Sequence, residues 1–288
     1  MEGLWPVIQT WFEFVKFEHT LFALPFAYLG AVLAQRGIPP VSKWFWITLA
    51  MVGARTAGMS LNRIVDRAID ASNPRTKGRA LQQGLIRLSH AKSLVWISLF
   101  LLLFSAWKLN PLCLWLSPFA FFLLVFYSYV KRFSASTHFV LGLVLACAPI
   151  GGWIAIEGRL PLLPILLGGA VLFWVAGFDV IYACQDVTFD KTFGIHSLPA
   201  RFGVARALFF STLFHLISLA LLLAVGFLGK LGPVFWAGWA LAALILLVEH
   251  RLISPHDLSR VNQAFFVMNG WVSAILFAAV FVDRVWLK

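Results

Sequence analysis

The sequence predicts an all-α, polytopic membrane protein with nine transmembrane helices. Of its 288 residues, 61% are hydrophobic and only 12% are charged, whereas charged residues make up about one quarter of an ordinary soluble protein. Apolar runs of about 18 or more residues recur along almost the whole chain, and such a run is long enough to cross a bilayer as a helix. The net charge of +11 arises mainly from the connections between these runs, so it orients the protein in a membrane and does not indicate nucleic-acid binding.

The predicted elements follow one another with short polar connections. Residues 1–18 combine aromatic and charged side chains, which predicts an amphipathic segment at the membrane interface. They lack the basic start and small-residue cleavage site of a removable signal peptide. We expect the nine spans at about residues 19–35, 42–71, 93–107, 111–130, 138–156, 162–189, 207–228, 232–249 and 261–283.

The basic residues predict the orientation of these spans. Of the 23 Lys and Arg residues, thirteen fall near span ends on the side of the N-terminus, seven fall on the other side, and three lie within the second span. The more basic side of a membrane protein faces the cytoplasm. We therefore expect a cytoplasmic N-terminus and an external C-terminus in a plasma membrane, which is the inner membrane in a bacterium.

Two short segments carry five of the twelve acidic residues. The first places Asn62, Asp66 and Asp70 at intervals of four residues, so on a helix they share one face. The second has three aspartates at intervals of seven and four residues, again on one face. Acids at membrane depth are costly and usually functional. The aspartates of the second segment are Asp179, Asp186 and Asp190.

These two segments have the chemistry of a magnesium site. Carboxylate oxygens suit Mg²⁺, which proteins usually bind through one or two carboxylates together with the phosphates of a substrate. Because both segments lie toward the cytoplasmic ends of long spans, we predict a Mg²⁺–diphosphate site at the membrane surface, with all five aspartates needed for catalysis. The simpler alternative is that each acid only pairs with a neighbouring Arg. The predicted metal ligands are Asn62, Asp66, Asp70, Asp186 and Asp190.

Basic and aromatic residues near the two segments are candidates for substrate binding. Mg²⁺ alone seldom neutralises a diphosphate, so we expect help from basic residues, although positive-inside anchoring would also explain them. Tyr182 shares a face with the second acidic segment, where it would either orient a substrate or pack at the interface. The basic candidates are Arg75, Arg79, Lys131, Arg132 and Lys191.

Arg55 is a candidate for binding a second substrate. It lies seven residues before Asn62, on the same face and about two helical turns deeper. A charge at that depth needs a polar cavity or a partner. We expect Arg55 to bind an anionic group such as a substrate carboxylate; the alternative is that it pairs with Asp179 or with a backbone carbonyl.

Three motifs resemble those of the UbiA superfamily of intramembrane aromatic prenyltransferases. Asn62–Asp70 followed by Asn73–Thr76 is similar to the first aspartate-rich motif of that family, and Asp179–Asp190 followed by Gly194–Ser197 is similar to the second. Tyr129–Arg132 is similar to the short motif after the fourth span. The resemblance covers essentially the whole chain.

The sequence departs from the family pattern at two positions. Arg63 stands directly after the motif Asn62, where many members have an acid. Ala80 follows Arg79, where relatives often have Pro. We therefore assign no metal ligand at position 63.

The resemblance implies nine helices around a central cavity, in one domain over residues 1–288. Cytoplasmic loops at about 72–92, 131–137 and 190–206 would cap it. The implied activity is Mg²⁺-dependent transfer of a polyprenyl group from polyprenyl diphosphate to an aromatic acid in quinone biosynthesis. The acceptor would be 4-hydroxybenzoate or, in the futalosine route to menaquinone, a dihydroxynaphthoate. The segment Phe17–Pro25 favours the second acceptor.

Two other functions are compatible with parts of this pattern. A secondary transporter of an anionic substrate also has many spans with charges, but it predicts charges near the bilayer midplane and paired interrupted helices. A superfamily member with a different acceptor, such as haem or a chlorophyll precursor, would keep the diphosphate site. For ring prenylation we expect Asp179, the deepest acid of the second segment, to accept the proton that the ring loses.

Overall fold

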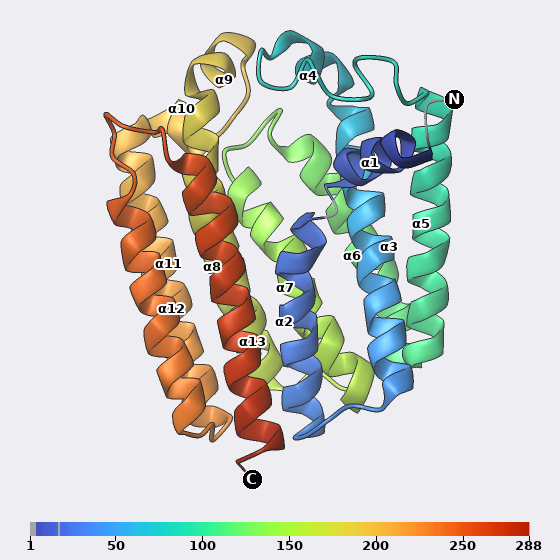
Figure 1. The fold of residues 1–288 in the computed structure, drawn as a ribbon, viewed down its shortest axis with the longest axis vertical. Helices are drawn as coiled ribbons and strands as arrows, with labels where there is room; N and C mark the ends of the chain where they lie inside the picture. The colour runs from blue at the N-terminus through green and yellow to red at the C-terminus, as the bar shows by residue number, and fades with distance from the viewer. Residues whose placement is uncertain (1–3, 17, 288) are drawn as a thin grey trace.

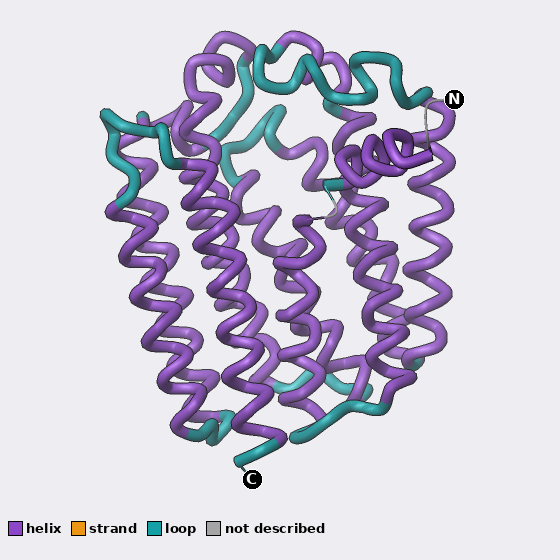
Figure 2. Tube along the Cα trace, in the orientation of Figure 1, coloured by secondary structure: helices purple, strands orange, loops and turns teal. Residues whose placement is uncertain are grey.

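The chain folds into a bundle of long helices. A computed structural model describes residues 4–16 and 18–287, and Figures 1 and 2 show the helices side by side, joined by short loops. Within the described residues, nine helices have 17 or more residues: α2 (Glu18–Gln35), α3 (Val41–Val65), α5 (Leu88–Leu109), α6 (Pro111–Val130), α7 (Thr137–Glu157), α8 (Leu162–Ala183), α11 (Val204–Leu228), α12 (Pro233–Arg251) and α13 (Asn269–Val285).

The prediction of an all-α polytopic membrane protein is confirmed. In the described part of the chain, seven helical segments are long and apolar enough to cross a membrane: α5, α6, α7, the helical run from Leu162 to Phe193, α11, α12, and the run from Gln263 to Val285. The last run begins with a π-helical turn, Gln263–Met268, before α13. Helices α2 and α3 run beside these seven in the bundle (Figure 1).

Short elements gather at one end of the bundle. Helices α4 (Arg67–Ser72), α9 (Val187–Phe193) and α10 (Leu198–Phe202) lie there together with the N-terminal helix α1 (Leu4–Val15), whereas the C-terminus lies at the opposite end (Figure 1). We call the end with α4, α9 and α10 the cap end. It contains the segments after α3, α6 and α8 that the resemblance implied as cap loops.

Helix α1 is amphipathic, as the sequence predicts. Trp5 and Phe12 are exposed, while Phe14 is buried against Leu81 and Ile86 of the cap end. In Figure 1 the helix lies across the end of α3 instead of along the bundle. This orientation is expected of an interfacial helix that keeps one apolar face in the membrane.

The structure corrects the prediction that each acidic segment lies on one continuous helix. The predicted span 42–71 is divided at Asp66, where α3 ends before α4 begins. The predicted span 162–189 is divided by a single 3₁₀ turn, Cys184–Asp186, between α8 and α9. The hydrogen bonds from the Asp66 amide to the Asn62 carbonyl and from the Asp70 amide to the Asp66 carbonyl, both 2.8 Å, persist across the first break. The acids therefore keep their helical spacing while the chain turns into the cap.

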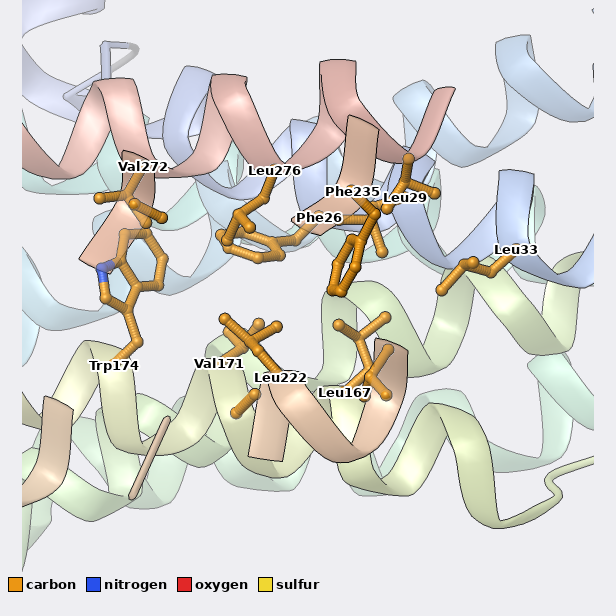
Figure 3. Close-up of a cluster of buried hydrophobic side chains, with 14 of the residues drawn as sticks. Phe26, Leu29, Leu33, Leu167, Val171, Trp174, Leu222, Phe235, Val272 and Leu276 are labelled. Atoms are coloured by element: carbon orange, nitrogen blue, oxygen red, sulfur yellow. The ribbon is translucent and has the colours of Figure 1, made fainter. Parts of the chain in front are cut away.

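The apolar core lies on the side of the bundle formed by α2, α8, α11, α12 and α13. Figure 3 shows its side chains pointing toward one another, among them Phe26 of α2, Trp174 of α8 and Leu276 of α13. Because lipid tails are as apolar as these side chains, close van der Waals packing between the helices stabilises this part of the core, and removal from water contributes little at membrane depth.

Glycines allow α7 to approach its neighbours closely. A Cβ atom at Gly142 would lie 2.3 Å from the carbonyl oxygen of Leu172 on α8, and one at Gly152 would lie 1.9 Å from that of Ala27 on α2. Small residues at helix contacts are typical of membrane bundles. This close packing brings the cap-end turn of α7, which contains His138, beside the cap-end half of α8, which contains Asp179.

Candidate active site

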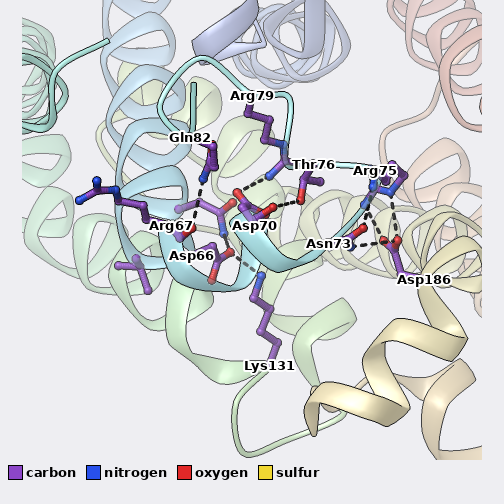
Figure 4. Close-up of polar contacts among 12 residues, drawn as sticks. Asp66, Arg67, Asp70, Asn73, Arg75, Thr76, Arg79, Gln82, Lys131 and Asp186 are labelled. Carbon is purple, nitrogen blue, oxygen red and sulfur yellow. Dashed lines mark hydrogen bonds and ion pairs between the residues drawn. The ribbon is translucent and has the colours of Figure 1, made fainter. Parts of the chain in front are cut away.

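The two acidic segments meet at the cap end, where α3 and α4 face α8 and α9 (Figure 4). Asp66 is only 1% exposed and accepts hydrogen bonds from three side chains. Its Oδ2 accepts from Asn62 Nδ2 at 3.0 Å and from Lys131 Nζ, and its Oδ1 accepts from Arg132 Nη2 at 3.0 Å. The basic pair follows α6, so the end of α6 supplies the positive charge for the end of α3.

Asp70 is held by the cap loop that follows α4. Arg79 Nη1 donates to Asp70 Oδ2 at 2.5 Å, and the Thr76 hydroxyl donates to the Asp70 carbonyl at 2.9 Å. Asp70 is buried, whereas the Arg79 side chain is 27% exposed. The loop is thus folded back so that its Arg lies over the motif acid (Figure 4).

Arg75 joins the first segment to the second. Its Nε and Nη2 donate to the two carboxylate oxygens of Asp186 at 3.0 and 2.5 Å, and its Nη1 donates to the Tyr182 hydroxyl at 3.0 Å. Asn73 Nδ2 adds a longer bond to Asp186 at 3.4 Å. Burial opposes the charge of Arg75, but the hydrogen bonds and charges of Asp186 and its neighbours outweigh that effect and raise the pKa of Arg75. A bidentate Arg–carboxylate pair of this kind is both strong and directional.

The other two acids of the second segment bond to groups that are not permanently charged. Asp190 is buried and accepts from the Ser197 hydroxyl at 2.7 Å. Asp179 Oδ2 lies 2.7 Å from His138 Nδ1. The Asp179 side chain is 19% exposed although its helical neighbours Phe178 and Val180 are buried. Its carboxylate therefore retains accessible surface deep in the bundle.

Arg55 and Tyr127 lie in the same region, deeper than the cap. Tyr127 of α6 lies within electrostatic range of Arg55, Asp66 and Asp179. Arg55 makes no ion pair with Asp179 among the described residues, which counts against that alternative, and its buried Nε has no hydrogen-bond partner there. A buried guanidinium N–H without an acceptor is unusual and costly, so Arg55 retains capacity to bind an anionic group.

Lys191 and Arg63 form no ion pair with the motif acids among the described residues. Lys191 is exposed on α9 and lies outside the set of paired side chains. Arg63 is buried, but it lies in a small pocket beside Glu13 and Phe14 of α1 and near Arg79. The basic residue at this unusual position therefore borders both the amphipathic helix and Arg79, close enough to Asp70 to interact with its charge.

Sequence reasoning missed His138 as a partner in the site. No spacing motif links it to Asp179, 41 residues away, and only the packing of α7 on α8 brings them together. Asn73 and Thr76 of the first motif have roles that the spacing does not predict, because Asn73 donates to the Asp186 carboxylate and Thr76 donates to the Asp70 backbone carbonyl.

The chemistry of the site fits a metal ion that binds together with a substrate. Among residues 4–16 and 18–287, no group of three or more His, Cys, Asp or Glu side chains lies close enough together to hold a metal ion by itself. Mg²⁺ is usually held by one or two carboxylates plus substrate phosphates, and buried carboxylates with basic partners at the same end of the bundle offer that combination.

This architecture defines the class of the protein. An all-α membrane bundle that gathers five carboxylates and four basic side chains at one end is suited to a polyanionic substrate at the membrane surface. The model of the UbiA prenyltransferase family matches residues 23–273. The chain therefore belongs to the UbiA prenyltransferase family and is an aromatic prenyltransferase, and the transporter alternative is set aside.

Similar proteins and structures agree with this assignment. A 4-hydroxybenzoate octaprenyltransferase of Aromatoleum aromaticum is 34% identical over 260 residues, covering 88% of this chain and 85% of the relative. The apo structure of a UbiA homologue from Aeropyrum pernix K1 matches with a TM-score of 0.85 and 36% identity, covering 93% of this chain and 98% of that one. A UbiA homologue from Archaeoglobus fulgidus bound to GPP and Mg²⁺ shares the fold, with a TM-score of 0.72, 20% identity, and coverage of 94% and 99%.

Proposed function

We propose that this chain transfers a polyprenyl group from polyprenyl diphosphate to an aromatic acid in quinone biosynthesis, with Mg²⁺ as cofactor and 4-hydroxybenzoate as the first candidate acceptor. The observation that carries the proposal is the meeting of two acidic segments, more than 100 residues apart, at one end of a membrane bundle. The activity named for the Aromatoleum relative and the Mg²⁺ and GPP named for the Archaeoglobus homologue support it.

The basic side chains are proposed to exchange partners when the donor binds. Arg79, Lys131 and Arg132 now donate to first-segment acids and Arg75 donates to Asp186. Phosphate oxygens accept the same N–H groups with charge-assisted hydrogen bonds. When bound, Mg²⁺ would neutralise the diphosphate as a leaving group, held by oxygens of Asn62, Asp66, Asp70, Asp186 and Asp190. Lys191 would add a contact from the surface of α9.

The acceptor is proposed to lie deeper than the donor diphosphate. Arg55 would bind its carboxylate through the N–H that now lacks a partner, and Tyr182 would orient it. In the reaction, the bond from C1 of the prenyl group to the diphosphate oxygen breaks first, and C1 of the resulting allylic cation then bonds to a ring carbon of the acceptor. The ring carbon then loses its proton to Asp179, whose carboxylate remains accessible at that depth.

Diphosphate release by the detergent-solubilised protein tests the proposal. The purified protein would be given a polyprenyl diphosphate and Mg²⁺ with either 4-hydroxybenzoate or 1,4-dihydroxy-6-naphthoate, and released diphosphate and prenylated product would be quantified. Product with 4-hydroxybenzoate supports the first candidate. Product with only the naphthoate assigns the menaquinone route favoured by the segment Phe17–Pro25, of which Phe17 lies outside the described residues. Failure with both acceptors, in folded protein that binds the donor, would require a different acceptor such as haem or a chlorophyll precursor.

We also propose that residues 1–288 form one functional domain in the bacterial inner membrane, with the cap end in the cytoplasm. The termini lie at opposite ends of the bundle, and α1 lies at the cap end (Figure 1). A cytoplasmic reporter fused after residue 288 should then be inactive, and an external reporter there should be active. The reverse result would contradict the proposed orientation.

A further inference from the structure

His138 is the one buried histidine in contact with an acid of the site among the described residues. Its side chain is 2% exposed, it occupies the first turn of α7, and its Nδ1 lies 2.7 Å from Asp179 Oδ2. His215, the other histidine that is buried in the described part of the chain, contacts His250 and the Trp174 carbonyl instead. The contact between His138 and Asp179 therefore connects α7 to the site acid that lies deepest in the bundle.

The cap determines which nitrogen of His138 carries the proton. The backbone N–H of Leu198, at the start of α10, donates to His138 Nε2 at 3.2 Å. A backbone amide is always a donor, so Nε2 must be an acceptor without a proton. The neutral ring then carries its proton on Nδ1, which donates to Asp179. In many functional sites, a hydrogen bond at one ring nitrogen of a histidine fixes which nitrogen carries the proton and how the ring is oriented. The Leu198 amide has this effect on His138.

The same turn of the cap holds a second acid. Ser197, next to Leu198, donates to Asp190 at 2.7 Å, and the amide of His196 donates to the Lys131 carbonyl at 2.8 Å. Residues 196–198 thus contact Lys131, Asp190 and His138 within three positions. The position of the His138 ring is therefore set by its hydrogen bond to this cap segment as well as by the packing of α7 on α8.

We infer that His138 is a positioning residue for prenyl transfer: it holds Asp179 by one oxygen, so that the other oxygen points at the aromatic acceptor and takes the ring proton. The inference rests on the proposed function. A carboxylate with only one fixed oxygen keeps a defined direction and a free lone pair, whereas a carboxylate without such a partner rotates about its side-chain bonds. His138 does not touch the substrate in this account.

Two substitutions separate positioning from a purely structural role. In His138→Asn the amide nitrogen takes nearly the place of Nδ1 and can still donate to Asp179, whereas in His138→Ala that donor is lost. His215→Asn is the matched control, because it changes a histidine buried in the same bundle that has no contact with the acids. Each purified variant would be assayed for kcat, for the KM of donor and acceptor, for donor binding with Mg²⁺, and for thermal stability.

We expect kcat of His138→Ala to fall by about 10- to 100-fold, the range found when an orienting partner is removed. Donor binding and the donor KM should stay within about twofold, His138→Asn should recover most of kcat, and His215→Asn should match the wild type. In the double variant with Asp179→Asn, His138→Ala should cause no further loss, because both changes act on one group.

Other outcomes overturn the inference. A kcat for His138→Ala within about twofold of the wild type, or equal losses in His138→Ala and His138→Asn, would show that the hydrogen bond to Asp179 does not matter. Additive losses with Asp179→Asn would show that His138 acts elsewhere. If Asp179→Asn itself retains full turnover, the inference fails while the proposed function stands, because the wild type still prenylates its acceptor. If the wild type forms no product with any acceptor, the proposed function is contradicted, and the inference about His138 is contradicted with it.

Discussion

The two acidic segments bend their helices in the same way but balance their charges differently. Asp66 has φ −85° and ψ 4°, and Asp186 has φ −101° and ψ 6°. Both lie in the sparsely populated bridge region, where many active-site residues are found. Each is followed four residues later by a second acid, Asp70 or Asp190, which is buried. The same backbone conformation therefore occurs at both helix breaks, one after α3 and one between α8 and α9.

The partners of these acids differ between the two segments. The two aspartates of the first segment are paired with three basic side chains, Arg79, Lys131 and Arg132. The three aspartates of the second segment have one permanently charged partner, Arg75 on Asp186. The first segment is therefore neutralised by the protein, while the second retains excess negative charge. On the proposed function, we therefore expect the basic partners of the first segment to supply most of the groups for the diphosphate, and the second segment to depend more on Mg²⁺.

The largest expected effects come from the acids themselves. Asp66→Ala and Asp190→Ala should each lower turnover by about a thousandfold or more, because each removes a proposed metal ligand. Their effects on stability should differ. Asp66→Ala leaves two basic groups without their partner and should cost about 1–3 kcal/mol of unfolding free energy, whereas Asp190→Ala frees only a serine hydroxyl. Turnover and thermal unfolding in detergent measure the two effects. Substantial residual turnover in either variant would count against the metal site.

Removal of a basic partner should weaken donor binding. Arg79→Ala and Arg75→Ala should each raise the donor KM by about 10-fold or more, since a hydrogen bond to a charged group contributes roughly 1.5–3 kcal/mol. Lys77→Ala, an exposed position in the same loop, is the matched control and should leave the donor KM unchanged. Equal effects in all three variants would mean that the loop acts through its general charge and not through the two paired arginines.

Arg55→Gln tests the separation between donor and acceptor. We expect the acceptor KM to rise by about 10-fold, because the substitution removes the charge that would bind the acceptor carboxylate. The donor KM should remain unchanged, since Arg55 lies deeper than the paired acids. Steady-state kinetics with each substrate varied in turn provides the comparison. A rise confined to the donor KM would place Arg55 at the diphosphate instead.

The smallest effect is expected at Lys191. Its side chain is exposed, so a contact with the diphosphate would be screened by solvent and contribute at most about 1 kcal/mol. Lys191→Ala should raise the donor KM by less than about fivefold, and the change should disappear at high salt. A loss as large as that of Arg79→Ala would show that α9 moves Lys191 into the site when the donor binds.

Much of this organisation could be predicted from residue pattern alone. The apolar runs predict the helices because a bilayer imposes both composition and length. The spacing of Asp66 and Asp70, and of Asp186 and Asp190, predicts that each pair lies close together. Arg75, Arg79, Lys131 and Arg132 all pair with motif acids, which is the simpler alternative that the sequence left open, and their contacts with a diphosphate stay a prediction.

The remainder depends on packing that no local pattern contains. An interval of four residues is compatible with a straight helix and with a helix that breaks at Asp66, because the hydrogen bonds across the break keep helical spacing. The contact between His138 and Asp179 requires α7 to approach α8 through Gly142. The burial of Arg63 beside α1 depends on where an interfacial helix docks, which its own sequence does not specify.

Donor binding with and without Mg²⁺ tests the central claim most directly. The Kd of a non-reactive polyprenyl diphosphate analogue would be measured by titration calorimetry with the wild type and with Asp186→Ala, in Mg²⁺ and in EDTA. We predict that EDTA weakens binding to the wild type by about 10-fold or more and that Asp186→Ala removes most of this difference. Equal affinity in Mg²⁺ and in EDTA for the wild type would contradict the claim that the acids of the two segments bind the donor through a metal ion.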